Sequence, residues 1–301
     1  MVTTNKTHVV GFSFSGITDD ATLVPVLFIF FLKVYLVTFV GNVGMVILVL
    51  KTPNLHTPMY FFLGYLSVML LDLLSIKKTI SFTGCALQFF IFAAMAATEA
   101  FILSNMSYDR YVAICHPLHY ASIMTKKKCW CLVLFSFTVG FMQSLVQTSC
   151  VFNLEFCGSN HIAHFYCDVP PLLKLSCSDT FICYMITTSI ISSCGVGSFL
   201  TILVSYTFIV SSILHIKSSE GRRKAFSTCS AHLTSVSILF GSVFFVYLRS
   251  STSDFGKQDK VASVFYTVIM PMLNPLIYSV RNQEVKKILR MASQRTQKPV
   301  H

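Results

Sequence analysis

Three ionisable side chains lie within or at the end of one long apolar segment. Glu99 lies inside it, and Asp109 and Arg110 lie near its end, directly before Tyr111. A charge in such surroundings must be paired or hydrated, and groups of this kind usually serve a function. Because Asp109 is next to Arg110, its carboxylate can hold the guanidinium in a resting state. This pair is therefore the first candidate for a functional site.

Other arrangements that could do chemistry are weaker. Ser, His and Cys residues are present, but no nucleophile and base have a recognisable arrangement for a membrane-embedded hydrolase. The formal charge of +11 could suggest a nucleic-acid partner. However, the basic residues flank apolar segments, and no Lys/Arg stripe follows a polar helix. We therefore expect neither an enzyme nor a nucleic-acid-binding protein.

Composition and segment length predict an integral membrane protein. Hydrophobic residues make up 54% of the chain and charged residues only 12%, with a mean hydropathy of +0.68, whereas a soluble domain has about 25% charged residues. Crossing a bilayer as a helix takes about 20 apolar residues. We expect an all-α bundle of seven spans, at 23–50, 59–76, 82–115, 131–151, 181–215, 231–248 and 261–280.

The basic residues predict the orientation of these spans. Fifteen of the 23 Lys and Arg residues lie in segments that are internal if the N-terminus is outside, and seven lie in external ones. Residues 1–22 would then be an outer tail, 23–280 the membrane domain and 281–301 an inner tail. The start of the chain shows no cleavable leader. Asn5 begins a glycosylation sequon that would face the lumen, whereas the Asn105 sequon would be buried.

Four of the eleven cysteines fall in the expected outer region, where disulfides persist. They are Cys85, Cys157, Cys167 and Cys177. Four cysteines allow three pairings, and the residues alone do not choose among them.

A set of motifs spread over nearly the whole chain resembles the odorant-receptor branch of rhodopsin-like G-protein-coupled receptors. The motifs are GN at 41–42, LHTPMYFFL at 55–63, SYDRYVAICHPL at 107–118, SY at 205–206, KAFSTCSAHL at 224–233 and PMLNPLIY at 271–278. The Asp-Arg-Tyr triplet alone is weak, but the ordered set is specific. The resemblance implies an odorant receptor in the plasma membrane, in sensory cilia, that activates a heterotrimeric G protein of the stimulatory type and raises cAMP.

The resemblance also implies roles at the inner end. Arg110 would be released when spans 3 and 6 separate, and Tyr206 and Tyr278 would stabilise the open state. Pro275 permits a kink whose freed backbone groups Asn274 can satisfy. Without the resemblance, Tyr206 and Pro275 would be read as residues that only pack and bend helices.

For the outer half, the resemblance implies a ligand site between spans 3, 5, 6 and 7. Its wall would be Phe92, Ala93, Ala96, Ala97, Ile190, Ile191, Cys194, Phe240, Val243, Phe244, Tyr247, Val264 and Thr267. None of these is charged, so the wall suits a small, mainly apolar volatile molecule and offers no acid for an amine. Taken singly, each position could equally be ordinary helix packing.

Two further expectations concern the loops and the tail. The resemblance implies disulfides Cys85–Cys167 and Cys157–Cys177, which leave only His161, His164 and Asp168 as scattered donors. We therefore expect no metal and no cofactor. Val285, Ile288 and Leu289 recur at helical spacing among cations, which predicts a short amphipathic helix on the inner leaflet, with a solvated tail as the alternative.

Span 2 departs from the family pattern. Leu66-Ser67-Val68 runs directly into a stretch that resembles the outer end of the span, which indicates an internal deletion of about a dozen residues, or about 18 Å of helix. Leu70 takes the place of an acid that would face Glu99 across a sodium and water pocket, and Asp72 is about 200° away around the helix. Smaller departures are Lys33, Phe137 and Phe240.

Two alternatives follow. In the same family, the chain could be a truncated variant that is retained in the endoplasmic reticulum and signals little, and receptor-transport chaperones would then matter. A transporter or channel would need internal repeats or broken polar helices, and we find neither.

Overall fold

The computed structural model describes residues 10–15, 22–40 without 24, 35, 38 and 39, then 79–157, 160–249, 263–265 and 269. Several predictions lie outside this part of the chain. They are the shortened span 2 with Leu70 and Asp72, the sequon at Asn5, the amphipathic tail helix, and Thr267, Asn274, Pro275 and Tyr278.

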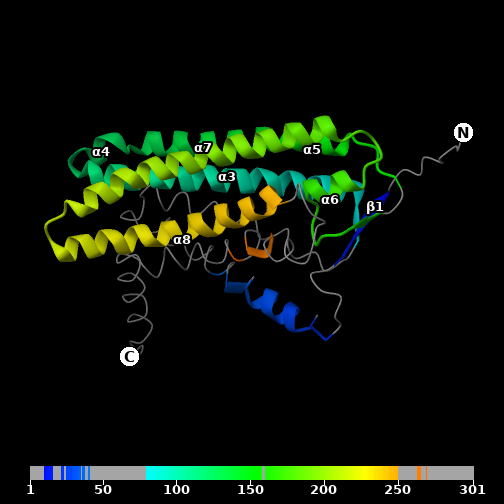
Figure 1. The fold of residues 1–301 in the computed structure, drawn as a ribbon, viewed down its shortest axis with the longest axis horizontal. Helices are drawn as coiled ribbons and strands as arrows, with labels where there is room; N and C mark the ends of the chain where they lie inside the picture. Colours follow the sequence, from blue (N-terminus) through cyan, green and yellow to red (C-terminus); the bar gives the residue numbers. More distant parts are fainter. Residues whose placement is uncertain are drawn as a thin grey trace, which may run out of the picture.

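Four described helices are long and apolar enough to cross a membrane. They are α3 (Phe82–Cys115), α5 (Lys126–Phe152), α7 (Phe181–Leu214) and α8 (Ser219–Arg249), and they run lengthwise in one bundle (Figure 1). These elements confirm the predicted helical membrane architecture. A shorter apolar helix, Pro25–Val34, lies within predicted span 1.

Two helices begin well before the predicted spans, because hydropathy locates the apolar part and capping locates the helix end. The Oγ1 of Thr125 accepts a hydrogen bond from the Lys128 amide at 3.3 Å, so α5 continues through three lysines. In the same way, the Ser218 hydroxyl accepts from the Gly221 amide at 3.1 Å, and α8 begins in the basic segment.

α3 is the central helix and packs against α5, α7 and α8. It approaches α5 closely at Gly140, where an added Cβ would clash with the Thr98 hydroxyl and lie 2.8 Å from the Ala94 carbonyl. Nearby, the Asn105 amide donates to the Ser136 hydroxyl at 2.9 Å. Asn105 is half-buried and joins two helices of the bundle, so its sequon lies at a helix contact.

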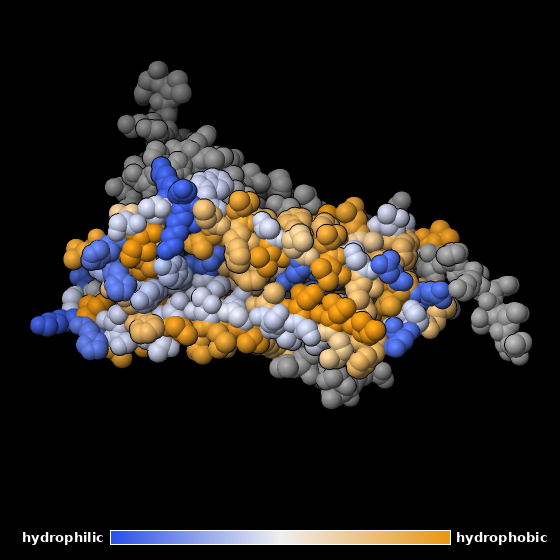
Figure 2. Space-filling view, turned by 90° about the horizontal axis from the view of Figure 1, so that it is seen from above, coloured by the Kyte–Doolittle hydropathy of each residue, from blue (hydrophilic) through white to orange (hydrophobic). Residues whose placement is uncertain are grey.

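The outer surface of the bundle is apolar. Large side chains such as Leu134, Phe135, Leu203 and Phe208 are more than half exposed. Figure 2 shows hydrophobic residues over the middle of the molecule and hydrophilic residues mostly towards its ends. A soluble monomer rarely exposes so much contiguous apolar surface, so this band suits contact with lipid.

The end of the bundle that was predicted to face outward is covered by a small sheet. Strands β1 (Gly11–Phe14), β2 (Thr79–Ser81) and β3 (His161–Ile162) lie in the order β2-β1-β3, with β1 antiparallel to β2 and parallel to β3. Phe12 is almost fully buried and packs on Phe156. Part of the segment expected to be a polar tail is therefore a strand, because alternate residues of β1 are aromatic and face the core.

Short helices complete the two ends (Figure 1). Helix α6 (Val169–Lys174) follows β3 beside the sheet, while η3 (Pro117–His119) and α4 (Tyr120–Ile123) connect α3 to α5 at the opposite end. The sheet with α6 and the loops around it is called the roof below.

Candidate functional site

A cavity of about 620 Å³ lies among α3, α5, α7 and α8 beneath α6. This volume is within the range typical of sites for small organic ligands. Much of its wall is apolar and includes aromatic rings from α8 and a run of alanines on α3. The alanines explain why there is a cavity, since their short side chains leave space that larger ones would fill.

The structure brings most of the predicted wall together. The predicted residues that line the cavity are Phe92, Ala93, Ala96, Ala97, Ile191, Cys194, Phe240, Val243 and Phe244. Ile190 does not line it, because it is one residue from Ile191 and so about 100° around α7. Val264 is also described and does not line it. The Tyr247 side chain and Thr267 lie outside the described part.

The cavity is more polar than the predicted wall. Glu99, Asp168 and Lys174 line it, which corrects the expectation of a wall without charges. Polar uncharged side chains also line it, namely Gln143 and Gln147 from α5 and Tyr184, Thr187, Thr188 and Ser192 from α7. No wall residues were predicted on α5, although its two glutamines are four residues apart and so share one helix face.

The roof is joined to α3 by a disulfide. Cys85 near the start of α3 is bonded to Cys167, with a Cα–Cα distance of 5.8 Å. The Cys167 amide also donates to Gln88 Oε1 at 3.2 Å. Next to it, the Asp168 carboxylate accepts from the Tyr166 hydroxyl at 2.9 Å and from the Val169 amide at 2.8 Å, which caps α6.

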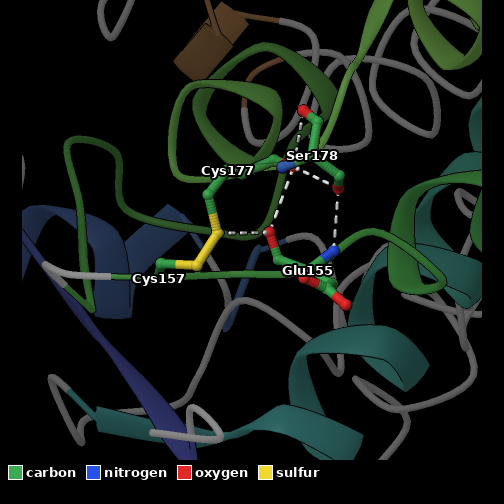
Figure 3. Close-up of a disulfide and its surroundings, with 5 residues drawn as sticks. Glu155, Cys157, Cys177 and Ser178 are labelled. Carbon is green, nitrogen blue, oxygen red and sulfur yellow. Dashed lines mark hydrogen bonds between the residues drawn. A yellow bond between two sulfur atoms is a disulfide. The ribbon is translucent and has the colours of Figure 1, made fainter. Parts of the chain in front are cut away.

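A second disulfide closes the roof on itself. Cys157 is bonded to Cys177, and Figure 3 shows the hydrogen bonds around this pair. The Cys177 amide donates to the Glu155 carbonyl at 2.9 Å, and the Glu155 amide donates to the Ser178 hydroxyl at 2.9 Å. Both disulfides join the pairs that the family resemblance implied.

At the opposite end of α3, Asp109 and Arg110 are both buried. We expected the Asp109 carboxylate to hold the Arg110 guanidinium. In the structure, the Asp109 carboxylate accepts a hydrogen bond from the Tyr120 hydroxyl of α4 at 2.8 Å. Burial raises the pKa of Tyr120, and the adjacent Asp109 charge raises this pKa further, so the phenol stays protonated and donates. The role predicted for Arg110 stays a prediction.

A buried hydrogen-bond network joins α3, α7 and α8, one to two helical turns from Asp109 towards the cavity. The Tyr206 hydroxyl lies 3.0 Å from His232 Nδ1 and 3.3 Å from the Cys229 carbonyl, while His232 Nε2 lies 3.0 Å from the Leu103 carbonyl. A carbonyl only accepts, so Nε2 of His232 donates to Leu103. His232 belongs to the KAFSTCSAHL motif, and no role was predicted for it.

Comparison with known proteins agrees with this architecture. The olfactory receptor family profile matches residues 31–295. Olfactory receptor 5AR1 of Mus musculus is 50% identical, with 94% of this chain and 95% of that protein covered. Olfactory receptor 5B12 of Homo sapiens is 48% identical, covering 94% of each chain, and olfactory receptor 5A1 of Homo sapiens is 48% identical, covering 95% of this chain and 94% of that one. With matches of this length and a helical membrane bundle, the chain belongs to the olfactory receptor family.

Proposed function

We propose that this protein is an odorant receptor that binds a small, mainly apolar volatile molecule in the cavity. Bound ligand would activate a heterotrimeric G protein of the stimulatory type and so raise cAMP. The observation that supports this most is the cavity itself, which is largely apolar and lies between the disulfide-bonded roof and the buried Asp109-Arg110 pair. Transfer of apolar ligand surface from water supplies about 0.8 kcal/mol per buried methylene.

Helix α8 offers a route from the cavity to the inner end. Phe240 and Phe244 line the cavity, and His232 is on the same helix, about 12 Å along its axis from Phe240 at 1.5 Å per residue. A ligand that displaces the aromatic part of α8 would therefore strain the hydrogen bonds of His232 with Tyr206 and Leu103. Separation of α8 from α3 and α7 would open the inner end to the G protein beside Arg110.

The direct test is a cAMP reporter assay with a panel of volatile compounds, using a receptor tagged at its N-terminus and compared at equal surface level. Ala96→Phe should abolish the response by filling the cavity. Leu87→Phe, an exposed position on the same helix, is the matched control and should respond as the parent does. Equal responses from both variants would show that the cavity is not the ligand site.

A second candidate, a shortened receptor that is retained in the endoplasmic reticulum, has its own support. The alignment with mouse olfactory receptor 5AR1 is 294 positions long, but it includes only 94% of the 301 residues of this chain, or about 283 residues. About eleven aligned positions of the relative therefore have no counterpart in this chain. This number agrees with a deletion in span 2. A shortened span must tilt less or thin the bilayer.

The two candidates are separated by counting receptors at the plasma membrane of intact cells. A repaired chain would carry a family-like segment between Val68 and Met69, with an acid three residues after Ser67. If the deletion is harmful, the repair raises the surface count several-fold and adds sodium sensitivity, and transport chaperones should help the unrepaired chain. Equal surface counts and equal odorant responses from both chains would show that the deletion is harmless.

A further inference from the structure

Helix α5 presents a stripe of small and polar residues that are buried within the bundle. Gly140, Ser144, Gln147 and Val151 are all buried and recur at intervals of three and four residues, so they share one face of the helix. Gly140 allows a close approach to α3, and the Ser144 hydroxyl donates to the Phe90 carbonyl of α3 at 2.6 Å. This stripe therefore faces α3, and its outer part reaches the cavity at Gln147.

Gln147 differs from its neighbours in the stripe because its amide is not satisfied. The side chain is only 2% exposed, and its Nε2 is buried without a hydrogen-bond partner. One turn earlier, Gln143 also lines the cavity, and its Oε1 is buried without a partner. Folded proteins satisfy most buried polar groups, so two such amides side by side need an explanation.

The position of the two amides suggests that a ligand supplies the missing partners. Ala93, Ala96 and Ala97 of α3 line the same cavity, and their short side chains leave space into which the two glutamine side chains can turn their buried polar atoms. From another helix, α8, Phe240 and Phe244 also line this cavity. One wall can therefore hydrogen-bond a ligand while another holds its apolar part.

We propose that Gln147 and Gln143 form a polar subsite that selects neutral oxygenated ligands, namely aldehydes, ketones, esters and alcohols. The Gln147 amide donates to the ligand oxygen, and Gln143 Oε1 accepts from a hydroxyl where the ligand has one. Primary amides are uncharged, so they can bind a neutral oxygen without leaving a buried ion behind when the site is empty. This inference rests on the proposed function, because it assigns the chemistry of the ligand that the cavity takes.

The experiment measures binding apart from signalling. The full-length receptor in lipid nanodiscs is titrated with octane, 2-octanone or octan-1-ol, and the shift in its thermal unfolding gives an affinity for each. The variants are Gln147→Met and Gln143→Met, which keep the side-chain length. Thr148→Val is the control, since Thr148 Oγ1 is also buried without a partner on α5 but does not line the cavity.

The expected result is that 2-octanone and octan-1-ol bind the parent more tightly than octane, and that Gln147→Met weakens the oxygenated probes about tenfold. Gln143→Met should weaken octan-1-ol more than 2-octanone. Octane affinity should stay the same in every variant, and the empty variants should be at least as stable as the parent, because an unsatisfied amide has been removed.

Three outcomes would overturn the inference. One is an equal loss for octane and the oxygenated probes, and another is an equal loss in Thr148→Val, because either would make the effect structural. The third is a parent receptor that binds octane and octan-1-ol equally well. Failure of the proposed function looks different, because then no probe stabilises the parent, and the inference falls with it.

Discussion

The two ends of the helix bundle are held together by different kinds of bond. At the roof, two disulfides and a three-stranded sheet join segments that are far apart in the chain. At the inner end, the described contacts between α3, α4, α7 and α8 include the hydrogen bonds of Tyr120, Tyr206 and His232. Cys115, Cys129 and Cys229, which lie near that end, are free thiols.

This difference suggests a division of labour along α3. A disulfide-bonded roof keeps the cavity in one shape, so that small differences between ligands translate into differences in affinity. Under the proposed function, the inner end exchanges partners when the G protein binds, and hydrogen bonds of about 1 kcal/mol each can be exchanged on the time scale of signalling. The four predictions below test this comparison, from the largest expected effect to the smallest.

Loss of the roof disulfide should have the largest effect. Cys85→Ser and Cys167→Ser should each lower the surface count severely, and the double variant should be no worse than either one. Both changes remove the same bond, which typically contributes about 2–4 kcal/mol to the free energy of unfolding. The measurement is surface count together with thermal unfolding. Clearly additive losses would mean that the two cysteines act separately.

At the inner end, Arg110→Ala should abolish G-protein activation while leaving ligand binding unchanged. Arg110 is buried at the far end of α3 from the roof, so its removal should not alter the cavity. The measurement compares odorant-driven cAMP with the ligand-induced shift in thermal unfolding, at matched surface level. Full signalling by this variant would contradict the role assigned to Arg110.

A smaller effect is expected from Tyr206→Phe, which removes one hydroxyl from the network between α7 and α8. The resemblance implies an open-state role for Tyr206, but in this structure its hydroxyl bonds to His232 within the packed bundle. If this bond of about 1 kcal/mol outweighs the open-state role, its loss should shift the closed state towards the open one and raise basal cAMP about fivefold, whereas a fall in cAMP would favour the open-state role. The control is Thr207→Val, because the Thr207 hydroxyl bonds within its own helix to Leu203. Unchanged basal activity in Tyr206→Phe would mean that the network does not restrain α8.

The smallest effect concerns the tail before the roof. Asn5→Gln should remove one glycan and shift the electrophoretic mobility of the protein, with little change in signalling, since the N-terminus is predicted to lie outside. An N-terminal tag that antibodies reach only after permeabilisation, in cells that export the protein, would contradict this topology.

Hydropathy alone predicted the helices that form the cavity, because long apolar runs have few alternatives in lipid. The predicted helix ends were less accurate, because Thr125 and Ser218 cap helices that extend into charged residues. The β1 strand was missed because alternation over four residues is a weak signal within a polar segment. The alternation becomes clear in the structure, where Phe12 and Phe14 are buried in the roof and their neighbours in β1 are less buried.

The polar side of the cavity could not be predicted from one helix at a time. Gln147 reaches the cavity because α5 approaches α3 closely at Gly140 and because α3 has alanines opposite. The bond from Tyr120 to Asp109 likewise depends on where a separate short helix places its hydroxyl. Such contacts arise from the relative positions of elements, which residue spacing within one element does not encode.

The order of strands in the roof has a consequence for how the protein is made. β1 is synthesised first, yet it lies in the middle of the sheet, between β2 at Thr79–Ser81 and β3 at His161–Ile162. With the N-terminus outside, as predicted, β1 can pair with β2 early in synthesis, but its other edge must remain unpaired on the lumenal side until the fourth span has been inserted into the bilayer. The roof therefore closes late, and a nascent chain stalled before residue 161 would expose the edge of β1 to lumenal chaperones.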